Sequence, residues 1–156
     1  AVIRNPLSVV NSWLRAPREF RRDLGWVEIE EWRYALKKNM NRPEEFNGFE
    51  RWKEAAYTFH RLKDRFPHRT FLLHYDQFLS NPLEGINELF SFLSLPITSS
   101  TLDFIRLSTS TSNGDAYAVF RDQDTRDKWQ YELDPAIISA IKDDLQGTEL
   151  EQYVHY

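Results

Sequence analysis

The sequence predicts an α/β protein in which a short parallel sheet is surrounded by helices. Two short apolar runs, 1–4 and 70–75, suit buried strands. Between and after them, apolar residues recur every three or four positions, which is typical of helices that bury one face. The helical segments outnumber the strands, so we expect the sheet to be small.

The first helix has clear start and stop signals. Asn5 is a typical N-cap and Pro6 a typical first helical residue, and Pro17 follows a pattern that extends to about Leu14. One further helix is expected around 28–38. A long amphipathic helix should then end at Pro67, with one face formed by Phe49, Trp52, Ala56, Phe59, Leu62 and Phe66.

The second half of the chain is predicted to continue with helices. A helix that begins after Asn81 and stops before Pro96 carries an apolar face of Leu83, Ile86, Phe90 and Leu93. Capping residues at 98–101 start a short helix, and the polar segment 108–128 is expected to be a long loop. Asp134 and Pro135 start a last helix with Ile137, Ile138, Ile141 and Leu145 directed inward.

Composition limits the class of protein. The 156 residues suit a single domain, 1–156, and 41% hydrophobic with 15% aromatic residues indicates a folded chain. A net charge of −4 argues against broad binding to nucleic acid or acidic membranes. The chain has no cysteine, which excludes disulfides and thiolate metal sites and favours a reducing compartment such as the cytoplasm. No stretch approaches the ~18 consecutive apolar residues of a membrane span.

An arginine stands where the first strand leads into the first helix. A helix start leaves unsatisfied backbone N–H groups and a partial positive charge, which together attract anions. Arg4 adds a planar fork of donors suited to phosphate, and Ser12 lies two helical turns further on. This pattern predicts a local anion site. The alternative is that Arg4 pairs with a neighbouring carboxylate and that Ser12 is an ordinary surface residue.

Three segments together resemble a known family. "IRNP", with Arg4 and Ser12 eight residues apart, resembles the 3′-phosphate-binding motif of the sulfotransferases that use 3′-phosphoadenosine-5′-phosphosulfate (PAPS). "LLHYDQFLSNPLEGINELFSFLSLP" resembles their Tyr-Glu-Asp-Leu segment, and "FRDQDTRDKWQYELDPAIISAIKDDL" resembles their closing segment. The resemblance implies a P-loop-like α/β fold, and transfer of a sulfuryl group from PAPS to a hydroxyl or amine. The chain would be the later part of that fold.

The resemblance also implies a nucleotide site for PAPS or its product PAP. Arg4 and Ser12 would hold the 3′-phosphate, and Tyr75 would lie beside the adenine. Tyr75 is equally well explained as an aromatic residue that completes the core at a strand end.

Two arginines near the end of the chain compete for a further phosphate contact. Arg121 matches the arginine of the family's Arg-Lys-Gly clamp, although Asp122 and Gln123 stand where lysine and glycine are expected. Arg126, shortly before Trp129, is a rival for the same role. The alternative for both arginines is ion pairing with neighbouring aspartates, which is worth about 0–1 kcal/mol on a surface.

Two functional parts of the family have no counterpart between Ala1 and Tyr156. The Gly-rich loop for the 5′-phosphosulfate and the catalytic base both lie upstream of the Arg-Asn-Pro strand, so we assign no catalytic residue and no metal site. The family's acceptor cleft corresponds to 18–60. There Trp26, Trp32, Tyr34 and Phe46 suit either a carbohydrate or lipid acceptor or simple core packing.

Two other functions are consistent with the sequence. The chain could be a non-catalytic relic of the sulfotransferase fold that serves as an interaction module, with Arg4 and Ser12 in structural roles. A fragment of a P-loop phosphotransferase is disfavoured, because no Walker sequence is present.

We expect the 156 residues alone not to transfer sulfuryl groups. General acid–base catalysis raises a reaction rate by about 10²–10⁴-fold, and positioning of the reacting groups raises it further. The resemblance places the residues for both effects upstream of Ala1. Transfer of radiolabelled sulfate from PAPS to sugar, phenol and lipid hydroxyls measures this. Turnover by the purified chain would contradict the expectation.

Overall fold

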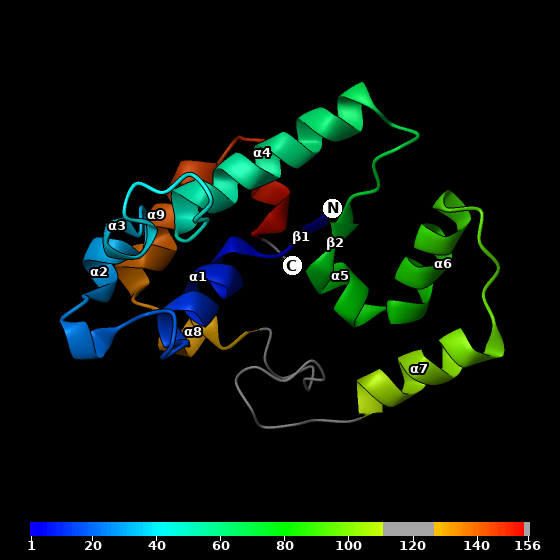
Figure 1. Cartoon of the computed structure of the whole chain (residues 1–156), viewed down its shortest axis with the longest axis horizontal. Helices are drawn as coiled ribbons and strands as arrows, with labels where there is room; N and C mark the ends of the chain where they lie inside the picture. Colours follow the sequence, from blue (N-terminus) through cyan, green and yellow to red (C-terminus); the bar gives the residue numbers. More distant parts are fainter. Residues whose placement is uncertain (111–126, 155–156) are drawn as a thin grey trace.

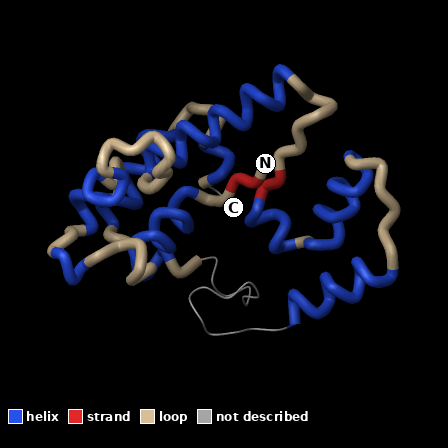
Figure 2. Tube along the Cα trace, in the orientation of Figure 1, coloured by secondary structure: helices blue, strands red, loops and turns tan. Residues whose placement is uncertain are grey.

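A computed structural model describes residues 1–110 and 127–154, and its helices surround a small sheet near the centre of the molecule (Figures 1 and 2). The general α/β class is confirmed, with helices far more extensive than strands. The helices are α1 (Pro6–Arg15), α2 (Glu28–Glu31), α3 (Leu36–Asn39), α4 (Phe49–Arg65), α5 (Tyr75–Ser80), α6 (Pro82–Phe92), α7 (Ser99–Ser110), α8 (Trp129–Glu132) and α9 (Pro135–Leu145). Two 3-10 helices, η1 (Arg22–Leu24) and η3 (Glu151–Tyr153), complete the set among these residues.

The sheet consists of two parallel strands. β1 (Val2–Ile3) pairs with β2 (Leu73–His74) so that Val2 lies opposite Leu73 and Ile3 opposite His74. Both strands are shorter than the predicted 1–4 and 70–75. At their carboxyl ends a helix starts almost at once, α1 at Pro6 and α5 at Tyr75. At its amino end β2 begins at Leu73, where its pairing with Val2 begins.

The predicted helix starts are confirmed at both ends of the chain. The Asn5 side chain accepts a hydrogen bond from the backbone N–H of Leu7 at 2.9 Å, and Asp134 accepts one from Ala136 at 2.8 Å. In each case the capping residue precedes a proline at the first helical position. Proline has no backbone N–H, and the first N–H of a helix has no partner within the helix, so no hydrogen bond is lost.

The expectation of one helix at 28–38 is wrong. Two short helices, α2 and α3, are separated by Ala35, whose φ of 49° is left-handed and cannot continue a helix. Asn39 stabilises this turn, because its side-chain amide donates to the carbonyls of Tyr34 and Asn47, each at 2.9 Å. Asn39 and Asn47 lie beyond the predicted helix, so its periodicity alone does not reveal the break.

The region after β2 also differs from expectation. The sequence predicted one helix after Asn81, whereas α5 already begins at Tyr75 and ends at Ser80. α6 then starts at Pro82, which lacks the N–H needed to continue α5. Two helices therefore follow the strand in place of one.

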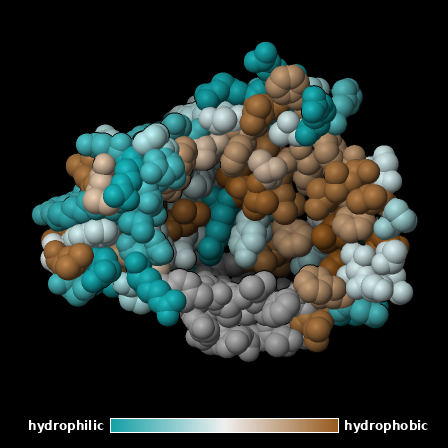
Figure 3. Space-filling view, viewed as in Figure 1, coloured by the Kyte–Doolittle hydropathy of each residue, from teal (hydrophilic) through white to brown (hydrophobic). Residues whose placement is uncertain are grey.

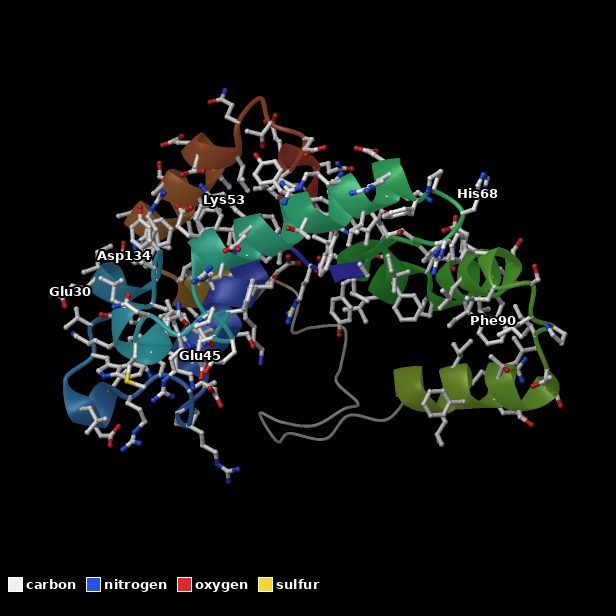
Figure 4. All side chains as sticks on the ribbon, turned by 45° about the horizontal axis from the view of Figure 1, so that its top comes forward. Glu30, Glu45, Lys53, His68, Phe90 and Asp134 are labelled. Atoms are coloured by element: carbon white, nitrogen blue, oxygen red, sulfur yellow. The ribbon has the colours of Figure 1, made fainter. Side chains whose placement is uncertain are left out.

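The core lies among α1, α4, α9 and the C-terminal segment. Its fully or almost fully buried side chains are Leu7, Val10, Leu14, Phe20, Phe49, Ile137, Ile141, Leu145 and Leu150. The α6–α7 side is less buried: Leu83 on α6 is 49% exposed and Phe104 on α7 is 60% exposed. Figure 3 shows hydrophobic residues gathered on this side and hydrophilic ones at the opposite end. In Figure 4, Phe90 lies on the α6–α7 side and Glu30 lies at the opposite end of the molecule.

Four charged side chains connect α4 to α9. Arg33 donates to Glu50 at 2.6 Å and to Asp144 at 2.8 Å, and Lys53 donates to Asp144 at 2.7 Å. Burial opposes ionisation of Asp144, but the hydrogen bonds from Lys53 and Arg33 outweigh it and hold the pKa of this carboxyl below its usual value. Asp144 therefore contributes stability as a carboxylate.

Replacing Asp144 with asparagine should lower the free energy of unfolding by about 1–2 kcal/mol at neutral pH, because two charge-assisted hydrogen bonds are weakened at a partly exposed site. The folded-state pKa is depressed, so this stability is present above about pH 4 and is lost as the pH falls through the folded-state pKa. Urea unfolding of the wild type and D144N between neutral and acidic pH measures both effects. The exposed neighbour Asp143 supplies the control D143N, and equal losses in the two variants would contradict the prediction.

Candidate functional site

The strand register brings two predicted site residues together. Arg4 follows β1 and Tyr75 follows β2, and the pairing of Ile3 with His74 places them side by side at the carboxyl ends of the strands. The guanidinium carbon of Arg4 lies 5.3 Å from the centre of the Tyr75 ring, within the range of a cation–π contact. The structure thus places at one point two side chains that are 71 residues apart.

The Arg4 side chain has unused hydrogen-bonding capacity. Its Nε is buried and has no hydrogen-bond partner among the described residues, and none of their carboxylates forms an ion pair with it. Its backbone is held in place, because Trp52 Nε1 on α4 donates to the Arg4 carbonyl at 3.1 Å. The alternative that Arg4 pairs with a neighbouring carboxylate is not seen within the described part of the chain.

The start of α1 differs from the predicted anion site. The buried carboxylate of Asp76 accepts a hydrogen bond from the backbone N–H of Asn5 at 2.7 Å, and the Asn5 side chain accepts one from the backbone N–H of Leu7. Two donors that an anion would use are thus satisfied from inside the protein. Any anion bound here would be held mainly by the Arg4 side chain.

Ser12 does not extend this site in the structure. It is exposed on α1, whereas Ser8, one turn earlier, is buried. Among the described residues no hydrogen bond joins Ser12 to Arg4, so its role stays a prediction.

Arg121 and Arg126 lie outside the described residues, as does most of the predicted 108–128 loop. Trp129, which follows them, packs against the core from α8, and Nζ of Lys142 on α9 lies 5.7 Å from its ring centre. It therefore helps to hold α9 in place.

The aromatic residues of 18–60 divide between core and surface. Trp32 is buried in the core, and Trp26 packs edge-on against Phe20 at 5.7 Å between ring centres. Tyr34 and Phe46 are each 54% exposed. Core packing accounts for the two tryptophans, and only Tyr34 and Phe46 face solvent.

A pocket of about 660 Å³ that the sequence did not indicate lies between β2, α5, α6 and η3. Its lining includes a hydrogen-bonded pair in which His60 Nε2 lies 2.9 Å from the Tyr153 hydroxyl. Burial and the nearby charge of Glu149 raise the pKa of Tyr153, and burial lowers the pKa of His74 against the opposing effect of Asp76. His60 and Tyr153 are 93 residues apart, and no motif signals their contact.

Two kinds of feature are absent from the described residues. No group of three or more acidic or histidine side chains there is arranged to hold a metal ion. Among the same residues, none of the helices combines the length and the apolar character that crossing a membrane requires.

Searches against protein-family models, curated proteins and solved structures found no match to this chain.

Replacing Asp76 with alanine should lower the free energy of unfolding by about 1–3 kcal/mol, because it leaves the buried N–H of Asn5 without an acceptor. Asp103, a solvent-exposed aspartate on α7, provides the control: D103A should change stability by no more than about 0.5 kcal/mol. Urea denaturation compares the two. A D76A protein as stable as D103A would show that Asp76 does not hold the start of α1.

Proposed function

We propose that this chain binds an adenosine nucleotide bearing a 3′-phosphate, as the later part of a PAPS-dependent sulfotransferase. The complete enzyme would transfer a sulfuryl group from PAPS to a hydroxyl or amine acceptor. The observation that carries the proposal is Arg4, which lies over Tyr75 with its Nε buried and unpaired among the described residues. The motif order supports it, since "IRNP" and "YDQF" meet at one point.

The position of Arg4 suits a nucleotide phosphate. In open α/β sheets, ligands bind outside the carboxyl ends of the strands, and Arg4 and Tyr75 follow two such ends. A buried donor without an acceptor costs about 1–3 kcal/mol, which a phosphate oxygen at Nε would recover. The planar guanidinium also suits bidentate contact with phosphate.

Each residue then has a defined role. Arg4 binds the 3′-phosphate, and the ring of Tyr75 orients the guanidinium and borders the adenine. Ser12 would add a hydroxyl donor from α1, and Arg121 or Arg126 would contact a second phosphate. Bound PAPS supplies the sulfuryl group, and the residues of this chain bind and orient its nucleotide end.

The alternative function, a non-catalytic interaction module, has an observation of its own in favour. Large apolar residues are exposed on and near α6 and α7, namely Leu83, Leu93, Leu95, Phe104 and Leu107. Exposed apolar residues in such number are typical of surfaces that contact a partner. Nucleotide preference separates the two functions, because an interaction module needs none.

We expect the protein to bind adenosine 3′,5′-bisphosphate about 10- to 100-fold more tightly than AMP, because one charge-assisted contact contributes about 1.5–3 kcal/mol. Replacing Arg4 with alanine should remove most of this preference. R4K, which keeps the charge but loses the planar fork, should retain only part of it. Isothermal titration calorimetry measures the affinity of the wild type, R4A and R4K for each of the two nucleotides.

Arg106, which is exposed on α7, supplies the control R106A, and this variant should keep the full preference. Equal affinity of the wild type for the two nucleotides would contradict the proposal. A preference that survives in R4A would assign the 3′-phosphate to another residue.

A further inference from the structure

The pocket between β2, α5, α6 and η3 lies apart from the Arg4–Tyr75 pair. His74 lines the pocket, whereas neither Arg4 nor Tyr75 does. The volume of about 660 Å³ is within the range that small ligands occupy. No lysine or arginine of the described residues lines it, whereas Glu84 and Glu88 do.

The hydrogen-bond directions at Tyr153 leave an acceptor for a ligand. His60 Nδ1 lies 3.3 Å from a Glu149 carboxylate oxygen, which can only accept, so this contact favours the tautomer with the proton on Nδ1. In that tautomer Nε2 is an acceptor, and the Tyr153 hydroxyl donates to it at 2.9 Å. A Tyr153 oxygen that donates its proton to His60 keeps lone pairs that can accept from a ligand, and Tyr153 is among the residues that line the pocket.

Two exposed carboxylates of α6, those of Glu84 and Glu88, line the same pocket. Asn81 donates from Nδ2 to Glu84 at 2.7 Å, which orients this carboxylate and leaves the amide oxygen of Asn81 as a further acceptor. Glu88 lies one turn later, on the same helix face. The lowered pKa of His74 keeps its ring neutral near pH 7, so it does not offset these charges.

An apolar wall completes the pocket. Leu72, Leu73 and Phe78 line it beside the polar groups. Gly85 allows this packing, because a Cβ at position 85 would come within 2.6 Å of the Phe78 ring. The pocket thus combines negative charge and hydrogen-bond acceptors with a surface for a hydrocarbon group.

We propose that this pocket binds a small organic cation, with a primary ammonium group held by Glu84, Glu88 and the Tyr153 oxygen and its hydrocarbon body against Leu72 and Phe78. The ligand is of opposite charge to the nucleotide phosphate proposed for Arg4. The proposed cation pocket and the proposed nucleotide site can therefore be tested independently.

The test compares cyclohexylmethylamine with cyclohexylmethanol, which share a shape and differ in the ammonium group. Titration of the full chain, followed by amide chemical shifts in NMR, should show saturable shifts around 72–88 and 152–153 with the amine only. Replacing both α6 carboxylates, E84Q/E88Q, should weaken amine binding at least about tenfold. The double variant E30Q/E54Q changes net charge equally at exposed ion-paired glutamates outside the pocket and should bind as the wild type does.

Several results would overturn the proposal. They are equal binding of the alcohol and the amine, no saturable shifts with the amine, or equal weakening in E30Q/E54Q. Thermal unfolding checks that each variant is folded. If E84Q/E88Q is not folded, Y153F takes its place, because it keeps the aromatic ring and removes the acceptor oxygen. Y153F should weaken amine binding severalfold, and unchanged amine binding in this variant would overturn the proposal. R4A should bind the amine normally while losing nucleotide preference, so failure of one site is distinguishable from failure of the other.

Discussion

The buried side chain and backbone of Asn5 connect three parts of the chain that are distant in sequence. Its Oδ1 caps α1, its Nδ2 donates to the carbonyl of Val154 at 3.2 Å, and its backbone N–H donates to Asp76 at 2.7 Å. One residue therefore holds the end of β1 against the start of α5 and against the C-terminal segment. Because the residue is fully buried, loss of any of these bonds leaves a polar group without compensation from water.

Both candidate sites depend on this connection. The contact with Asp76 maintains the register that places Arg4 over Tyr75. The contact with Val154 positions the adjacent Tyr153, whose ring stacks on His74 at 4.9 Å and whose hydroxyl reaches His60. A short sheet of two residues per strand can thus organise the proposed anion site and the proposed cation site, because the bonds of Asn5 add to the few hydrogen bonds between the strands.

Stabilisation is distributed unevenly over the molecule. The α1–α4–α9 side has a buried apolar core, and the ion pairs of Arg33 and Lys53 with Asp144 connect α4 to α9. The α6–α7 side buries few large side chains completely, with Ile105 an exception. Since apolar burial supplies most of the driving force for folding, α6 and α7 have less of their own to resist local opening. The proposed cation pocket lies at the boundary between these two sides.

Local signals in the sequence determined much of the helical outline. Asn5–Pro6 and Asp134–Pro135 start helices through capping bonds within three residues. The predicted apolar face of α4 is buried at Phe49 and Ala56, whereas Leu62 at its far end is 41% exposed. The same signals failed at Ala35 and at Tyr75. There a left-handed residue held by Asn39 and an immediate strand-to-helix transition override periodicity. The choice of Arg4 and Tyr75 as site residues came from motifs in the sequence, and their contact needed the strand register.

Only the tertiary structure decided which polar groups already have partners. Asp76 accepts from the backbone N–H of Asn5, a donor at the start of α1 that the sequence left open to an anion, and this depends on a contact across 71 residues. The Glu149–His60–Tyr153 arrangement joins α4 to the C-terminal segment in the same way. Capping and amphipathic spacing act over a few residues, so they can be read along the chain. Hydrogen bonds between distant residues depend on how the elements pack, and no local pattern encodes them.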